Sequence, residues 1–285
     1  MPVPLLAQIR EIRVTDDVGR ALVLPAWPRR IISLAPNITE ILFRLGAGER
    51  VVGVTRYCDY PPETRAIEKV GGILDPDVER IKSLRPDVVI AFRGNPLDVL
   101  RKLEEIGVPL FILDIKNELS AVPHLVEKIG AVVGRTDAAA RLNAELTAKS
   151  AAVAAALEKA RMKPRIFLSL EGLGLWTFGR DSYFNDLLGR AKAVSVTGTI
   201  DKRWFEYGRE TLIQDNPDAI VILAKSEADF RRAAEWFRGQ PVIRNLTAVR
   251  QGRILFLDQN AASRFGPRLF DTLFDLARLL HPDCF

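Results

Sequence analysis

The stretch that most limits the possible folds of this chain is the run from Thr136 to Met162, TDAAARLNAELTAKSAAVAAALEKARM. It is rich in Ala, Leu, Glu and Lys and contains no Gly or Pro. Residues of this kind favour helix, so the run predicts a single helix of roughly 25 residues, about 40 Å long. A sustained heptad seam is absent, which argues against a coiled coil. We therefore expect a stiff helix that joins two lobes.

On both sides of this run, strand-like and helix-like segments alternate. Residues 11–24 predict a β-hairpin around an Asp-Asp-Val-Gly turn, and residues 30–36 predict a buried strand. Asn37 is predicted to cap the helix that follows, with Glu40 at the capping-box spacing. Alternation of strands and helices is typical of parallel βαβ units. The sequence predicts an α/β fold of two lobes with central, mostly parallel sheets, joined by one long α-helix, with a ligand cleft between the lobes.

A short internal repeat supports two similar lobes. Residues 79–90 and 210–222 each place a Pro-Asp pair seven residues after a Glu and directly before a predicted strand. The length of 285 residues suits one large or two medium domains. The expected parts are an N-terminal segment with the hairpin (1–28), an N-terminal α/β lobe (29–134), the linking helix (135–162) and a C-terminal α/β lobe (163–285).

Charge and hydropathy exclude several classes of partner. The chain has 41 Lys and Arg against 36 Asp and Glu, and the basic residues are scattered, so we expect no nucleic-acid partner. No apolar run is long enough to predict a membrane-spanning helix. The opening PVPLLAQ is consistent with the tail of a signal peptide that has been removed, or with a frayed terminus.

The residues that usually carry catalysis or bind metal are sparse. Neither His124 nor His281 has a carboxylate or cysteine at ligand spacing, so both are predicted to be plain surface residues. Cys58 and Cys284 make no disulfide framework and no Cys-rich metal site. Phosphate-loop and dinucleotide fingerprints are also absent. We expect no enzyme activity, no cofactor and no resident metal.

Aromatic residues recur in the loops that follow predicted strands. Tyr57 follows strand VVGV beside Pro61 and Pro62, which stiffen its turn, and Trp176 lies in the glycine-rich GLGLWTFG (172–179). Trp204 and Phe265 extend the pattern in the second lobe. Ligands of open α/β sheets bind at the carboxyl ends of the strands. The pattern therefore predicts a site for a large, flat, partly apolar ligand.

Four motifs, RIISLAPNITE, YCDYPPE, DVERIKSLRPDVVIAFRG and RETLIQDNPDAIVIL, resemble the cobalamin-type substrate-binding proteins of ABC importers. The similarity covers nearly all of residues 12–280 and implies membership of the helical-backbone class that carries siderophores, haem and cobalamin. The resemblance implies a monomeric periplasmic or otherwise extracytoplasmic protein that captures cobalamin or a related corrinoid and delivers it to a permease. A ferric siderophore or haem is the alternative ligand, and a two-lobed α/β enzyme is the less favoured alternative.

The resemblance also assigns roles to individual residues. Tyr57 falls on a tyrosine that contacts the corrin, Phe92 falls where the cobalamin binder has Trp, and Trp176 falls where it has Phe. Ile73 and Ala261 fall where relatives present Trp, and so reduce the aromatic contact area. The full set of expected ligand contacts is Pro36, Asn37, Tyr57, Phe92, Arg93, Trp176, Trp204, Arg264 and Phe265.

For docking on the permease, the family uses one acidic residue on each lobe. Glu79 matches the first-lobe position, whereas Ser263 occupies the second-lobe position and cannot form the ion pair. An anionic ferric siderophore remains an alternative ligand, because clustered arginines suit such a complex. The arginines concerned are Arg56, Arg93 and Arg264.

Overall fold

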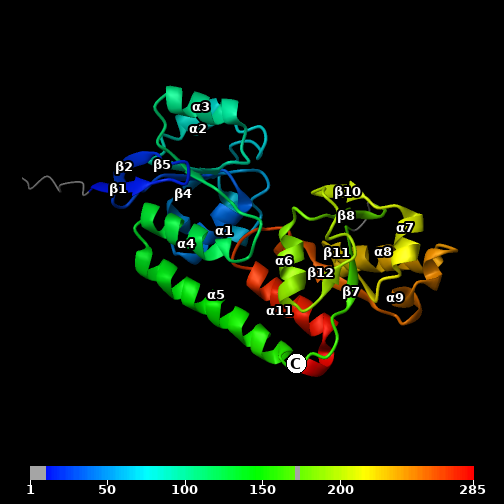
Figure 1. Cartoon of the computed structure of the whole chain (residues 1–285). Helices are drawn as coiled ribbons and strands as arrows, with labels where there is room; N and C mark the ends of the chain where they lie inside the picture. The colour runs from blue at the N-terminus through cyan, green and yellow to red at the C-terminus, as the bar shows by residue number, and fades with distance from the viewer. Residues whose placement is uncertain (1–10, 171–173) are drawn as a thin grey trace, which may run out of the picture. The chain divides into compact units, whose positions relative to one another are not determined.

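The computed structural model describes residues 11–170 and 174–285, which form two compact units (Figure 1). The expectations for PVPLLAQ, and for the first two residues of GLGLWTFG, lie outside the described residues. Unit 1 contains the described residues up to Lys116 together with Ser120–Glu145, and unit 2 contains Asn117–Leu119 and Leu146–Phe285. Each unit is built around one parallel four-stranded sheet, so the predicted two-lobed α/β class is confirmed.

The unit 1 sheet has the strand order β4-β3-β5-β6, with all strands parallel. Its strands are almost wholly buried, as their continuous apolar character predicts. Helices α2 and α3 cover one face, and α1 and α4 cover the other (Figure 1). The bounds are β3 Ile31–Ser33, α1 Pro36–Arg44, β4 Val51–Val54, α2 Val78–Ser83, β5 Val88–Phe92, α3 Leu97–Glu105, β6 Leu110–Leu113 and α4 Ala121–Val132.

The predicted hairpin is confirmed as β1 (Glu11–Thr15) and β2 (Ala21–Pro25), paired antiparallel. Its turn is fixed by Asp16, which is 3% exposed and accepts hydrogen bonds from the backbone N–H groups of Val18 and Arg20. The backbone N–H of Asp17 donates to the carbonyl of Ile112 in β6 at 3.0 Å. The hairpin turn therefore lies against an edge strand of the unit 1 sheet.

Helix α1 begins differently from its predicted start. The N-cap is Ala35, which forms no side-chain cap, and Pro36 takes the first helical position. Proline suits that position because its φ is fixed and it has no N–H to leave unpaired. Asn37 lies inside the helix and is 6% exposed. The prediction that Asn37 caps the helix is therefore wrong.

The unit 2 sheet repeats the arrangement with the order β12-β11-β7-β9, again all parallel. Helices α8 and α9 pack on one face, and α6 and α11 lie on the other (Figure 1). A two-stranded antiparallel ribbon, β8 with β10, stands beside it. The bounds are β7 Arg165–Leu170, β8 Trp176–Phe178, α6 Tyr183–Arg190, β9 Val194–Ser195, β10 Trp204–Glu206, α7 Arg209–Asp215, β11 Ala219–Ala224, α8 Glu227–Gly239, α9 Thr247–Arg250, β12 Ile254–Asp258, α10 Gln259–Ala262 and α11 Leu269–Leu280. Short 3₁₀ turns occupy Gly48–Arg50, Pro62–Ala66, Ile243–Asn245 and Pro282–Cys284.

The Pro-Asp repeat has the same structure in both units. In unit 1, Asp87 donates its N–H to the carbonyl of Arg30 at 2.8 Å, and its carboxylate accepts the Arg30 N–H at 2.9 Å. In unit 2, Asp218 makes the same pair of bonds to Arg165, at 2.8 and 2.7 Å. Each aspartate thus clamps the start of a neighbouring parallel strand, which explains why the motif recurs.

Helix α5 (Thr136–Leu157) spans 22 residues without Gly or Pro and passes from unit 1 into unit 2. It ends before Met162, the predicted end, and residues 158–159 form a turn. In unit 1 its Glu145 carboxylate binds Arg44 at 2.9 Å, and in unit 2 its Lys149 binds Asp271 at 2.6 Å. Among the described residues, no helix is both long enough and apolar enough to span a membrane.

Candidate functional site

Unit 1 offers a candidate surface where its four parallel strands end. Because the carboxyl ends of parallel strands meet at one edge, the loops after β4 and β5 lie at the same edge of the sheet. These loops carry Tyr57 and Arg93. The first turn of α1 follows β3 at this edge, with Pro36 half-buried and Asn37 buried. The sequence therefore brings five of its predicted unit 1 contacts to one edge: Pro36, Asn37, Tyr57, Phe92 and Arg93.

Tyr57 is 48% exposed, and a fixed cation lies against its ring. The guanidinium carbon of Arg56 is 5.3 Å from the ring centroid, within cation–π range. The same guanidinium binds both carboxylate oxygens of Asp75 at 2.7 Å. Hydrogen bonding to Asp75, and secondarily to Tyr57, raises the pKa of Arg56. The tyrosine ring is thus held at the surface beside a permanent positive charge.

Cys58 points away from this surface. It is 2% exposed, and its sulfur lies 3.2 Å from the hydroxyl oxygen of Thr39 and 3.1 Å from that of Thr55. The interpretation of Cys58 as a small residue that fills the turn is confirmed by this burial. Its thiol is therefore not presented to a ligand at the strand edge.

Asn95 organises the edge, although the sequence did not single it out. It is 4% exposed, and its side-chain amide donates to the carbonyls of Leu34 at 3.2 Å and Ile73 at 3.0 Å. Its side-chain oxygen accepts the N–H of Phe92 at 3.0 Å. One side chain thus joins three loop segments. The Asn-Pro pair that begins at Asn95 marks a turn in the sequence and is the signal that would have drawn attention to it.

Phe92 is the last residue of β5 and Arg93 directly follows it, and their side chains lie in different environments. Phe92 is half-buried, and a Cβ atom on Gly94 would lie 2.1 Å from its ring, so the ring packs directly against the backbone of Gly94. Arg93 is exposed and binds the carboxylate of Asp114, which follows β6, at 3.3 Å. The aromatic ring is therefore packed in place while the arginine remains accessible.

In unit 2 the ribbon of β8 and β10 brings two tryptophans together. Trp204 pairs with Phe178, and Glu206 pairs with Trp176. In an antiparallel ribbon, residues that pair across the two strands point to the same face, and so do residues two positions apart along one strand. Both tryptophans therefore lie on one face of the ribbon. Trp176 is 38% exposed and Trp204 is 45% exposed, and Trp204 packs edge-on against Phe178 with ring centroids 4.5 Å apart. The sequence placed Trp176 in a loop and missed the pairing.

Phe265 lies in the packing of unit 2. It is 9% exposed, and its ring packs edge-on against Tyr183 at 5.3 Å between centroids. The Tyr183 hydroxyl donates to the carbonyl of Ala262 at 2.7 Å, and burial raises the pKa of Tyr183. Arg264 is half-buried, and its charge lies near this tyrosine. Phe265 therefore presents less surface to a ligand than Trp176 or Trp204 does.

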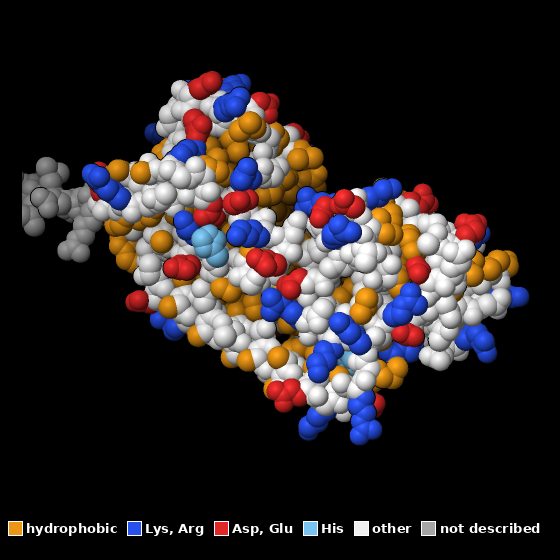
Figure 2. Space-filling model, in the orientation of Figure 1, with side chains coloured by type: hydrophobic (Ala, Val, Ile, Leu, Met, Phe, Trp, Pro, Cys, Tyr) orange, Lys and Arg blue, Asp and Glu red, His pale blue; other side chains and the backbone are white. Residues whose placement is uncertain are grey.

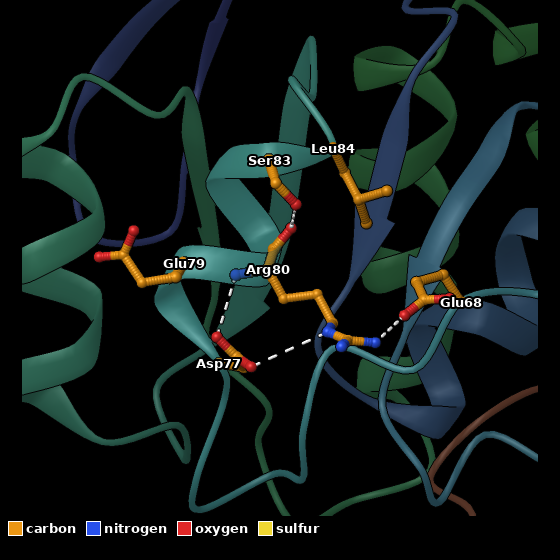
Figure 3. A pocket seen from close by; sticks show the side chains of 6 residues that line it. All are labelled: Glu68, Asp77, Glu79, Arg80, Ser83 and Leu84. Carbon is orange, nitrogen blue, oxygen red and sulfur yellow. Dashed lines mark hydrogen bonds and ion pairs between the residues drawn. The ribbon is translucent and has the colours of Figure 1, made fainter.

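Glu79, the predicted docking residue, lies at a cavity of about 560 Å³ on unit 1 (Figure 3). Arg80 is bound by Glu68 and lies 3.9 Å from a carboxylate oxygen of Asp77. Figure 3 shows the Glu79 side chain pointing away from this group. The residues that line the cavity are Glu68, Asp77, Glu79, Arg80, Ser83 and Leu84.

The two histidines have different environments. His281 is 7% exposed, and its Nε2 lies 2.9 Å from the carbonyl oxygen of Ala191, so the prediction of a surface residue is wrong. His124 is exposed and contacts the carboxylate of Asp17 at 3.1 Å.

Within residues 11–170 and 174–285, no cluster of three His, Cys, Asp or Glu side chains is arranged to hold a metal ion. On the face shown in Figure 2, basic and acidic side chains are interspersed.

The comparison with known protein families covers most of the chain. The model of the family described as periplasmic binding protein matches residues 31–261. The chain belongs to the periplasmic binding protein family. The predicted membership in the substrate-binding class is confirmed, and so is the prediction of a binding protein rather than an enzyme. An extracytoplasmic location is supported by the same family assignment.

Relatives and solved structures agree with this membership. The chain is 28% identical over 287 residues to the uncharacterized ABC transporter substrate-binding lipoprotein YvrC of Bacillus subtilis, with 98% of this chain and 88% of that protein covered. It is 29% identical to the vitamin B12-binding protein of Pectobacterium atrosepticum, with 86% and 85% covered. The apo structure of the periplasmic heme-binding protein RhuT from Roseiflexus sp. RS-1 matches with a TM-score of 0.80 and 27% identity, with 90% and 99% covered.

Proposed function

We propose that the protein captures cobalamin or a related corrinoid outside the cytoplasm and delivers it to the permease of an ABC importer. The observation that carries this proposal is the exposure of aromatic rings at loops and ribbons of both units. Tyr57 supplies one such ring in unit 1, and Trp176 and Trp204 supply two in unit 2. A soluble protein gains little by exposing such rings unless a ligand covers them.

The corrin ring system suits these surfaces because it is broad and largely apolar, with polar groups at its periphery. Exposed aromatic faces bind such a ligand mainly through the area that they remove from water. Arg93 and Arg264 supply hydrogen-bond donors for peripheral groups. The similarity to a vitamin B12-binding protein supports the same choice. No resident cofactor is part of this proposal.

Haem is the second candidate ligand, and one contact favours it. The Tyr57 hydroxyl and the fixed cation of Arg56 lie together, and hydrogen bonding between them contributes to the raised pKa of Arg56. Tyrosine is an established axial ligand of haem iron. The structural similarity to a heme-binding protein is consistent with this alternative.

A colour-retention experiment separates these ligands. The purified protein is mixed with cyanocobalamin, hemin or a ferric siderophore, desalted, and its absorption spectrum is recorded. We expect a retained corrinoid spectrum in a 1:1 ratio. Retention of hemin alone would replace the corrinoid proposal with the haem candidate. Retention of none of the three would contradict the proposed function.

A further inference from the structure

Two exposed leucines lie at the carboxyl edge of the unit 1 sheet. Leu74 is 74% exposed, which makes it the most exposed large hydrophobic residue in the described part of the chain, and Leu97 is 60% exposed. A single exposed leucine is common and needs no explanation. These two differ because each is carried on a segment whose backbone is fixed, and because the two segments are joined.

The loop that carries Leu74 is held at several points. Gly71 has a φ of +91°, and a Cβ atom there would lie 2.4 Å from the carbonyl oxygen of Asp75, so glycine is required. The N–H of Arg56 donates to the carbonyl of Gly71 at 2.8 Å. The N–H of Gly72 donates to the carbonyl of Asp75 at 3.2 Å. Leu74 is therefore held at the tip of a fixed turn.

Asn95 joins this loop to the segment that carries Leu97. Its side-chain amide binds the carbonyl of Ile73, the residue directly before Leu74, at 3.0 Å. Pro96 follows Asn95 as the N-cap of α3, and Leu97 is the first residue of that helix. The two leucines are thus positioned by one buried side chain.

The charge directly beside Leu74 is paired. The carboxylate of Asp75 is bound by Arg56, whose guanidinium also lies against the ring of Tyr57. The charge of Asp75, the residue directly after Leu74, is therefore neutralised by Arg56. An apolar surface with its neighbouring charges paired suits an apolar occupant better than a charged one.

We propose that Leu74 and Leu97 form an apolar subsite that holds the methyl- and methylene-bearing edge of a tetrapyrrole-like macrocycle. This inference rests on the proposed function and adds residues that the resemblance does not assign. It also accounts for Ile73, where a relative's tryptophan is missing. The lost aromatic area is replaced by two leucines beside that position.

The subsite is tested with the variants Leu74→Ser, Leu97→Ser and the double variant. Met162→Ser is the matched control, because Met162 is 71% exposed and lies outside the strand edge. Both leucines are exposed, and serine suits the first turn of a helix, so the variants should fold. Binding of cyanocobalamin and of hemin is measured by calorimetric titration, and folding is checked by urea denaturation.

We expect each leucine variant to weaken binding of the ligand that the wild type takes by about tenfold, and the control to stay within about twofold. Unchanged affinity in the double variant, with wild-type binding intact, would overturn the subsite and leave the proposed function standing. If the leucine variants keep their ligand affinity but no longer support transport, the leucines contact the permease, and the subsite proposal is overturned. Failure of the wild type to bind either ligand would overturn both proposals.

Discussion

The guanidinium carbon of Arg56 lies 5.3 Å from the ring centroid of Tyr57, and the same guanidinium binds Asp75 at 2.7 Å. The ring and the charge therefore act as one unit at the edge of the unit 1 sheet. Removing the ring removes contact area, whereas removing only the hydroxyl leaves that area in place. A corrin contact needs only the ring, whereas ligation of haem iron needs the hydroxyl, so the two changes distinguish these ligands.

Tyr57→Ala is expected to weaken ligand binding by about tenfold to a hundredfold, because a buried aromatic contact contributes about 1–3 kcal/mol. Tyr57→Phe is expected to retain corrinoid affinity within about threefold, since a corrin contact needs only the ring. Calorimetric titration with cyanocobalamin measures both. An equal loss in both variants would show that the hydroxyl, and not the ring area alone, is needed to hold the corrinoid.

The two tryptophans of the unit 2 ribbon are expected to behave differently. Trp204→Ala should lower the free energy of unfolding by about 1–3 kcal/mol, because Trp204 packs edge-on against the buried Phe178. Trp176→Ala should leave stability nearly unchanged and weaken binding by about tenfold to a hundredfold. Urea denaturation and ligand titration of both variants provide the test. A loss of stability in Trp176→Ala as large as that in Trp204→Ala would show that Trp176 is a packing residue.

The carboxylate of Asp17 should make stability fall in acid. Burial raises its pKa, but hydrogen bonds from the Asp114 N–H, His124 and Lys128 outweigh this, so its pKa lies below the usual 3.8. The unfolded chain therefore binds the proton first, and the contribution is present above about pH 4 and is lost as pH falls through the folded pKa.

Asp17→Asn is expected to lower the free energy of unfolding at pH 7 by on the order of 1–2 kcal/mol. The difference from wild type should shrink at pH 3, below the usual carboxyl pKa of 3.8, because the unfolded wild-type chain binds a proton there and the contribution of the carboxylate falls. Urea denaturation at both pH values measures it. A difference that grows in acid would contradict the assigned direction.

Glu79→Ala is expected to abolish transport while leaving ligand affinity unchanged, because the side chain points away from the Arg80 ion pair and lies outside the proposed ligand contacts. Glu105→Ala, a change at an exposed glutamate of α3, is the matched control. Uptake is measured with the protein, its permease and labelled ligand in reconstituted vesicles. Normal uptake by Glu79→Ala would move the docking contact elsewhere.

Local patterns were enough to predict much of the fold. The Pro-Asp pairs predicted strand starts because Asp87 and Asp218 act on residues of an adjacent strand in a fixed geometry. The composition of residues 136–162 predicted α5, since helix propensity acts over consecutive residues. The end of that helix was less predictable, because fraying at Leu157 depends on what the following residues contact.

Features that depend on distant residues could not be predicted in the same way. The three-residue strand β8 exists because it pairs with the strand β10, and such a short segment carries no pattern of its own. Asn95 looked like a turn residue, and its role depends on Leu34 and Ile73. His281 is polar and near the chain end, yet its partner Ala191 lies within the packing of unit 2.

The most direct test of the account is a calorimetric titration of the wild-type protein with cyanocobalamin, alongside hemin in a parallel titration. We expect saturable 1:1 binding of cyanocobalamin in the micromolar range or tighter, which corresponds to about −8 kcal/mol or more favourable. The heat capacity change should be negative, since apolar surface is buried. Absence of saturable cyanocobalamin binding, with hemin bound at 1:1, would contradict the corrinoid assignment.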